Sequence, residues 1–287
     1  MATIRAIKNK IKSAKSTQQI TKAMKMVSVS KFRKNQAAMT SLRPFAQKSR
    51  EIMESLSAGG EHENRYMVKR PVVKRVCYVA FVGNRGLCGA YNTNVIKYLR
   101  ELARRETAEK TAVFVGRWGR DLIRDGSLPI EKWFDAVSDT PTEEQGIELA
   151  EYLKSLYLSG GADKIVLVYS KFKNALSQTP ASMELLPVKP APETEENSAA
   201  GYIFEPDREA VLENIIELYV NNTVYSALLE AKTGEHASRI TAMTAATDNT
   251  EEVIEELNLY LNRARQDHIT TEISEIVGGA AALRKKE

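Results

Sequence analysis

Two long stretches without helix-breaking residues, one at each end, constrain this chain most. The first 57 residues contain no glycine and one proline, Pro44, and residues 207–277 contain no proline and one glycine, Gly234. Glycine and proline destabilise helix interiors most, so these stretches favour helices of roughly 85 and 105 Å at ~1.5 Å per residue. We predict two helical rods, residues 1–58 and 207–287, with a separate domain at residues 59–206 between them.

The two predicted rods carry opposite charge. Residues 1–58 hold 13 Lys and Arg against two Glu, whereas residues 207–287 hold 8 basic and 15 acidic side chains. Opposite charge favours rods that lie side by side. Exposed ion pairs contribute little each, however, so we expect apolar burial to be the larger stabilising term.

Apolar residues at heptad spacing predict a coiled-coil seam along the first rod. The seam is interrupted at residues 18–28, where its positions are polar and a second apolar group lies on another face. Two interpretations remain open: the helix rotates against its partner here, or a separate protein binds this segment. The seam residues are Ile4, Ile7, Ile11, Ala14, Phe32, Met39, Leu42, Met53 and Leu56; the polar ones are Gln18, Thr21, Lys25 and Ser28; the second apolar group is Ile20, Met24 and Val27.

The second rod has a seam of its own, which shifts phase near Ala264. The shift predicts that the supercoil unwinds and that the last turns present their apolar face elsewhere. The uncharged tail after Ile276 suits a helix tip held in an apolar socket. Before the shift the seam holds Ile240, Met243, Thr247, Thr250, Ile254, Leu257, Leu261 and Ala264; after it come Ile269, Ile273, Ile276, Ala280 and Leu283.

The middle of the chain alternates short strand-like and helix-like segments. Apolar runs at 76–82, 112–116 and 164–169 are typical of buried strands, and residues 92–105 and 118–124 favour helices. Thr140, Pro141 and Glu143 predict a capping box that opens a helix ending near Leu158. The alternation predicts a mostly parallel α/β sheet covered by helices, followed by an exposed loop at 187–201.

Motifs for catalysis, cofactors or metals are weak. The loop at 83–89 follows a predicted strand, but its G-x-x-G-x-x-G spacing matches neither a dinucleotide fingerprint nor a P-loop. His62, His236 and His268 lack the spacing of metal ligands, and two cysteines make no disulfide framework. We therefore expect no cofactor and no metal. No apolar run is long enough to span a membrane.

Three alternatives remain open at this point. The basic, amphipathic start of the chain has features of a transit peptide, although its isoleucines continue in register with the following residues. A small α/β enzyme would need a ligand at residues 83–89. A nucleic-acid binder would use Lys8 to Lys34, where only Phe32 and Phe45 provide aromatic rings for stacking.

Several motifs in the same order resemble the gamma subunits of bacterial F-type ATP synthases. The likeness extends from the first residues to the last. The matching segments are ITKAMKMVS at 20–28, RGLCG at 85–89, YIFEP at 202–206, RITAMTAATDN at 239–249, NRARQ at 262–266 and IVGGAAAL at 276–283.

The resemblance implies an antiparallel coiled coil of the two terminal helices plus a central α/β, Rossmann-like domain. It implies a non-catalytic rotor shaft that couples rotation of the c-ring to conformational cycling of the catalytic beta subunits of a proton-translocating enzyme. The implied partners are the ring of three alpha and three beta subunits, the epsilon subunit and the c-ring, with one copy of the chain per complex. Nucleic acid is not among them. The implied location is peripheral, on the cytoplasmic face of the bacterial membrane and attached only through Fo.

The resemblance also implies contact roles for particular residues. It places Lys22, Met24, Arg239, Arg265, Gln266 and Thr270 against beta subunits. Ile276, Val277 and Leu283 belong to the bearing tip, and Arg85, Gly86, Leu87, Tyr202 and Glu205 to a contact with the c-ring and epsilon. The sequence departs from the family pattern at Asn84, where aspartate is common, and at Asp267 and His268, where small residues are usual.

Overall fold

The computed structural model describes residues 4–57, 64–67, 70, 72–119, 128–172, 174, 178–189, 205 and 207–284. The chain divides into two compact units. The coiled unit comprises Met1–Val27 with Ala242–Glu287, and the body unit comprises Ser28–Thr241. Each unit is described by itself below.

Both predicted terminal helices are present. Helix α1 spans Ile4–Ser57 and helix α4 spans Arg208–Arg284, so both units contain part of each helix. Asp207 caps α4, because its Oδ1 accepts the backbone N–H of Ala210 at 2.9 Å. The predicted helical rods are therefore confirmed, with ends close to those expected from the proline and glycine pattern.

The body unit contains a five-stranded sheet in the order β3-β2-β1-β4-β5. The strands are β1 (Arg75–Phe81), β2 (Glu109–Val115), β3 (Ile130–Phe134), β4 (Lys164–Phe172) and β5 (Gln178–Leu186). The first four are parallel and β5 is antiparallel to β4, which confirms the mostly parallel sheet. Strands β3 and β5 were not predicted. Both are edge strands, in which polar residues such as Glu131 and Lys132, and Pro180 in β5, interrupt the apolar pattern.

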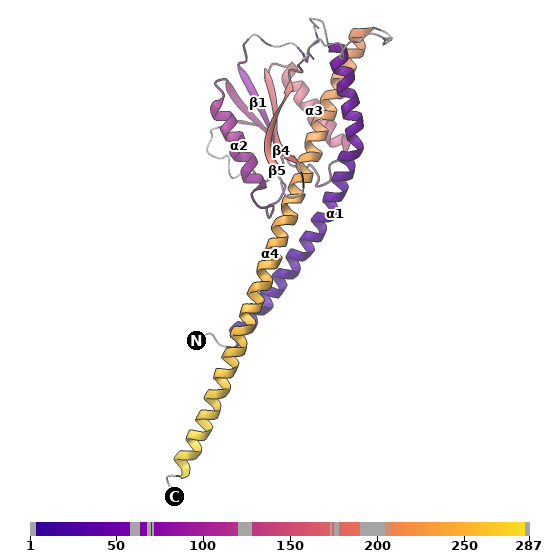
Figure 1. Ribbon diagram of the computed structural model, residues 1–287. Helices are drawn as coiled ribbons and strands as arrows, with labels where there is room; N and C mark the ends of the chain where they lie inside the picture. The colour runs from indigo at the N-terminus through magenta and orange to yellow at the C-terminus, as the bar shows by residue number, and fades with distance from the viewer. Residues whose placement is uncertain are drawn as a thin grey trace. The chain divides into compact units, whose positions relative to one another are not determined.

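Helices cover both faces of this sheet (Figure 1). Helix α2 (Tyr91–Arg105) packs Val95 and Leu99 into one apolar core, which also holds Phe114 of β2. Helix α3 (Glu143–Leu158) and the body-unit parts of α1 and α4 form the larger core on the other face. The two terminal helices are thus part of the folded domain as well as of the coiled coil.

The start of α3 corrects one prediction. The N-cap is Thr142, two residues after the predicted Thr140, and the capping box pairs it with Gln145. The Thr142 backbone N–H donates to Gln145 Oε1 at 3.4 Å, and the Gln145 amide also donates to the Ala136 carbonyl at 3.2 Å. The predicted helix at 118–124 lies mostly outside the described residues, as does most of the loop at 187–201.

In the coiled unit, α1 and α4 pack in antiparallel directions. Ile7 and Ile11 of α1 and Met243 and Ile254 of α4 are buried. The polar positions of α1 do not leave the seam: Thr21 is 8% exposed, and its Oγ1 lies 2.9 Å from Oγ1 of Thr247. The helix therefore does not rotate at residues 18–27, and Ile20 stays 57% exposed.

Charge contributes less to this pairing than the opposite signs of the rods suggest. Among the described residues of the coiled unit, no ion pair joins α1 to α4; the one ion pair found there links His268 to Glu272 on α4 itself. The burial of the seam residues, including the Thr21–Thr247 contact, accounts for the packing.

Candidate partner-contact surfaces

The C-terminal end of α4 exposes the residues predicted to contact partners. Taking the Thr21–Thr247 contact as the register, Ile4 falls opposite Ala264, so the described part of α1 offers no partner beyond that position. The predicted phase shift coincides with this loss of a partner helix. The exposed residues beyond it include Arg265, Gln266, Ile269, Thr270, Ile273, Ile276 and Val277.

The apolar character of this end is unusual for a water-exposed helix. Ile276 is 71% exposed, and Ile269, Ile273 and Val277 are also large exposed apolar residues. Contiguous apolar residues on a surface mark an interaction site more often than single ones do. Leu283, the third predicted tip residue, lies in the helix, but its side chain is outside the described part of the chain.

A second exposed apolar group lies on α1 in the coiled unit. It consists of Ile20, Met26 and Val27, all more than half exposed. Lys22 is exposed beside it, whereas Met24 is half-buried. Ile20 and Val27 were predicted to belong to this apolar group, whereas Met26 was not, because its spacing of six residues from Ile20 does not place it on the same helical face.

Arg239 lies in a buried charge cluster of the body unit. Glu235 accepts Nζ of Lys232 at 2.9 Å with one carboxylate oxygen and Nη2 of Arg239 at 2.7 Å with the other. Burial raises the pKa of Glu235, but the two cations outweigh it and lower the pKa overall. Because its side chain is only 8% exposed and already paired, Arg239 holds its own chain together here.

The same cluster fixes the loop at residues 83–89. Arg239 Nη2 donates to the backbone carbonyls of Arg85 and Gly86, both at 3.4 Å. A Cβ on Gly83 would lie 2.9 Å from Glu235 Oε1, so the carboxylate lies directly against this loop. The side chains of Glu235 and Arg239 therefore fill the space on the α4 side of this loop.

The loop presents Leu87 outward. This residue has a φ of 60°, which is rare outside glycine, and its side chain is 62% exposed. The Gly83 N–H donates to Asn92 Oδ1 at 2.7 Å and Asn84 Nδ2 donates to the Val137 carbonyl at 2.7 Å. The loop is therefore held from several sides in a conformation that exposes an apolar side chain.

The structure does not bring together the residues predicted to contact the c-ring and epsilon. Arg85, Gly86 and Leu87 lie beside Arg239, whereas Glu205 lies before the start of α4 at Arg208. About 45 Å of helix separates Arg208 from Arg239. Tyr202 lies outside the described residues. These residues belong to two separate regions of the body unit.

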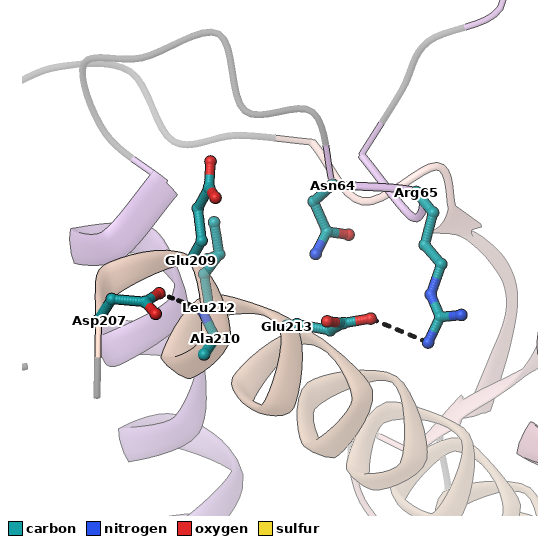
Figure 2. Close-up of a pocket in the computed structure, with 7 residues that line it drawn as sticks. All are labelled: Asn64, Arg65, Asp207, Glu209, Ala210, Leu212 and Glu213. Carbon is teal, nitrogen blue, oxygen red and sulfur yellow. Dashed lines mark hydrogen bonds and ion pairs between the residues drawn. The ribbon is translucent and has the colours of Figure 1, made fainter. Parts of the chain in front are cut away.

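An acidic cavity of about 490 Å³ lies at the start of α4 (Figure 2). Arg65 is the one cation among the described lining residues, and it is paired with Glu213 at 3.0 Å and Glu217 at 3.1 Å. Figure 2 shows Arg65 extending toward Glu213 on the helix. The described lining residues are Asn64, Arg65, Asp207, Glu209, Ala210, Leu212 and Glu213.

Other kinds of site find little support. The described residues include no cluster of His, Cys, Asp and Glu suited to a metal ion. Burial raises the pKa of the Cys88 thiol and raises that of Cys77 to about 12, so both favour the unreactive thiol form. Among the described helices, none has an apolar stretch able to cross a membrane.

Comparison with known proteins decides the family. The sequence profile described as ATP synthase matches residues 3–283. The ATP synthase gamma chain of Desulfitobacterium hafniense is 42% identical over 283 residues, which cover 99% of this chain and 100% of that protein. The chain belongs to the ATP synthase gamma-chain family. The gamma chain of Moorella thermoacetica is 43% identical over 284 residues, again with 99% of this chain and 100% of the relative covered.

A solved structure supports the fold of this gamma-chain family member. A chain of the Euglena gracilis mitochondrial ATP synthase, in a structure of OSCP, F1 and the c-ring, matches with a TM-score of 0.67. The match covers 98% of this chain and 94% of that chain at 22% identity. The predicted family and the predicted combination of long terminal helices with an α/β domain are confirmed.

Proposed function

We propose that this chain is the central rotor shaft of an ATP synthase. It couples rotation of the c-ring to conformational cycling of the catalytic beta subunits. Its partners are the ring of three alpha and three beta subunits, the epsilon subunit and the c-ring, and one copy serves each complex. Family membership over the full chain supports this function, as does the gamma-chain name of relatives that match from end to end.

One structural observation favours the shaft role in particular. The described end of α4 exposes large apolar residues, and no other described helix of the chain covers them. A bearing formed by partner subunits would bury those residues. In this proposal Ile276, Val277 and Leu283 belong to the tip, and Arg265, Gln266 and Thr270 contact beta subunits.

The shaft acts by differential contact. The coiled unit carries unlike faces, with lysines on α1 and glutamates on α4, so each beta subunit meets a different surface as the shaft turns. Contacts that are more favourable with one beta conformation than another bias the equilibrium between those conformations. Lys22, with the exposed patch of Ile20, Met26 and Val27, supplies one such contact.

The chain itself performs no catalysis in this proposal. The glycine-rich loop at 83–89 has neither dinucleotide-fingerprint nor P-loop spacing, and the side chain of Glu235 lies against it. The protein is peripheral, on the cytoplasmic face of the bacterial membrane. It reaches the membrane only through the c-ring.

Affinity purification of the tagged chain from its native cells tests this function. We expect the alpha, beta and epsilon subunits to co-purify and the assembled complex to pump protons when given ATP, while the chain alone turns over no ATP. Recovery of the chain without ATPase subunits, or ATP hydrolysis by the isolated chain, would contradict the proposal.

A further inference from the structure

A continuous chain of hydrogen bonds in the body unit links α1 to α4 through one residue, Asp139. This residue lies in the segment between β3 and α3. Its carboxylate Oδ2 accepts Lys31 Nζ from α1 at 2.5 Å. Its backbone carbonyl accepts Asn35 Nδ2 from α1 at 2.9 Å and lies 3.1 Å from His236 Nε2 of α4. Asp139 thus contacts both terminal helices at once.

The imidazole of His236 has a defined tautomer in this arrangement. A carbonyl oxygen only accepts hydrogen bonds, so Nε2 must carry the hydrogen that faces Asp139. The other ring nitrogen, Nδ1, lies 3.2 Å from Nη1 of Arg239, which only donates. Both ring nitrogens of neutral His236 therefore have a complementary partner, and the ring is buried.

The links continue from α4 to the rest of the body. Arg239 also binds Glu235 and the carbonyls of Arg85 and Gly86 in the loop after β1. Directly before that loop segment, Asn84 donates to Val137, two residues from Asp139. These hydrogen bonds therefore connect the loop after β1, the segment before α3 and both terminal helices.

The position of these residues along the helices is informative. Lys31 and Asn35 lie within about two turns of Ser28, where the body unit begins, and His236 and Arg239 lie within about two turns of Thr241, where it ends. A register shift between α1 and α4 in the body would have to break the bonds to Asp139. Buried polar groups stripped of partners cost about 1–3 kcal/mol each, so such a shift is opposed at this level.

We propose that Lys31, Asn35, Asp139 and His236 form a clasp that holds α1 and α4 in one register, so that torque on the body passes into both helices without slip. The inference rests on the rotor function proposed above. The four residues are positioning residues. The clasp makes the efficiency of coupling, rather than the rate of ATP hydrolysis, depend on contacts within this chain, two of them made by the buried side chains of Asn35 and His236.

The test uses the assembled complex in membrane vesicles and compares Lys31→Met with Lys34→Met. Lys34 is an exposed lysine of α1 in the same body unit that lies outside the clasp, so both variants lose one lysine charge from the same stretch of helix. ATP hydrolysis and ATP-driven proton uptake are measured on the same vesicles. We expect Lys31→Met to lower the protons moved per ATP by about twofold or more, with hydrolysis retained, and Lys34→Met to match the wild type.

Two variants of His236 extend the test. His236→Leu removes both hydrogen bonds and should lower the same ratio, whereas the amide of His236→Gln can still donate toward Asp139 and should restore much of it. If His236→Leu prevents assembly, Lys31→Met decides the matter, because that lysine side chain is 32% exposed and its loss is compatible with folding. An unchanged proton-to-ATP ratio in Lys31→Met would overturn the clasp.

The two proposals fail in different ways. Wild-type complexes that lack this chain, or that do not pump protons, would contradict the rotor function. Wild-type complexes that pump normally, together with clasp variants that pump equally well, would contradict only the clasp. Hydrogen exchange in the assembled complex gives a further readout, with faster exchange expected at residues 31–35 and 232–239 in Lys31→Met.

Discussion

At the scale of single residues, Asn84 shows how one atom changes the chemistry of a loop. Its amide donates to the Val137 carbonyl at 2.7 Å, a bond that an ionised aspartate is unable to make because a carboxylate has no donor. The amide at position 84 therefore has a local physical consequence. The amide ties the loop after β1 to the segment before α3.

Gly116 is a residue whose backbone requires glycine. Its φ is +114°, and an added Cβ would lie 2.2 Å from the carbonyl oxygen of Val82. We expect Gly116→Ala to lower the free energy of unfolding by about 2–4 kcal/mol, from strain plus displaced backbone. Gly89→Ala is the matched control: φ is +57° but nothing lies within 4 Å, so about 1 kcal/mol is expected. Equal losses in urea denaturation would contradict this account.

His236 predicts a dependence of stability on pH. Burial lowers its pKa below the ordinary value of 6.5, and with the help of Arg239 it outweighs the opposing effects of Glu235 and Asp139, which raise the pKa. The unfolded chain therefore binds a proton near pH 6.5 that the folded chain does not. The contribution of neutral His236 to the free energy of unfolding is complete above about pH 6.5 and diminishes as the pH falls toward the lower folded-state pKa.

Urea denaturation of the chain between pH 7.5 and 5.5 measures this effect. We expect the free energy of unfolding to decrease across that range in the wild type and to decrease less in His236→Gln. Asp139 and Glu235 also have lowered pKa values, but their contributions are lost at more acidic pH, below their unfolded values of 3.8 and 4.5. Identical slopes in the two proteins would show that His236 is not responsible.

At the scale of elements, the coiled unit continues its seam through polar residues. The hydroxyls of Thr21 and Thr247 lie 2.9 Å apart across the seam, and each also lies within hydrogen-bond distance of a carbonyl of its own helix, Gln18 and Met243 respectively. Because each hydroxyl has one hydrogen, one of the two donates across the seam while the other donates to its own helix. The seam therefore stays in phase without apolar side chains at this level. The neighbouring apolar residues are left on the outer face, where Ile20, Met26 and Val27 are exposed.

A double-mutant cycle on Thr21 and Thr247 tests this arrangement. Thr21→Val or Thr247→Val alone leaves one hydroxyl without its cross-helix partner, so each should lower stability by about 1 kcal/mol. The double variant replaces both hydroxyls with methyl groups of similar shape and should equal or exceed the wild type. Additive losses in thermal melting followed by circular dichroism would show that the two hydroxyls are not coupled.

At the scale of the whole molecule, burial separates the apolar residues that pack α1 against α4 from those that are available to partner subunits. Ile7 is buried in the seam, whereas Ile20 on the same helix is exposed. We expect Ile7→Ser to lower the helix melting temperature of the isolated chain, because it removes an apolar side chain from the seam and adds a hydroxyl. Ile20→Ser should leave that melting temperature within about 1 °C, since surface substitutions change stability little.

Retention by partner subunits should depend on Ile20, although the stability of the isolated chain should not. Ile20→Ser is expected to reduce retention of the chain by the ring of alpha and beta subunits, measured by co-purification at matched expression, although the isolated chain is as stable as the wild type. Retention equal to that of the wild type would remove Ile20 from the contact surface. Such a result would not contradict the seam or the fold, because neither depends on Ile20.

Much of the architecture follows from sequence pattern alone. The scarcity of glycine and proline indicates both long helices, and heptad spacing identifies their seam because helical periodicity is local. Buried apolar runs identify β1, β2 and β4, whose residues are covered on both faces. The edge strands β3 and β5 escaped prediction because one side of each faces solvent, which allows polar residues and Pro180 to replace the apolar pattern.

The roles of individual residues depended on tertiary structure. The sequence alone determined the family resemblance, the two helical rods and the alternation of strands and helices. Each of these is a pattern among residues that lie close together in the sequence. Only the fold decided that Arg239 is turned inward toward residues 85 and 86, that Asp139 joins α1 to α4, and that the regions of Leu87 and Glu205 lie apart. Those relations link residues about 100 or more positions apart, and burial and hydrogen bonding between such residues have no local sequence pattern.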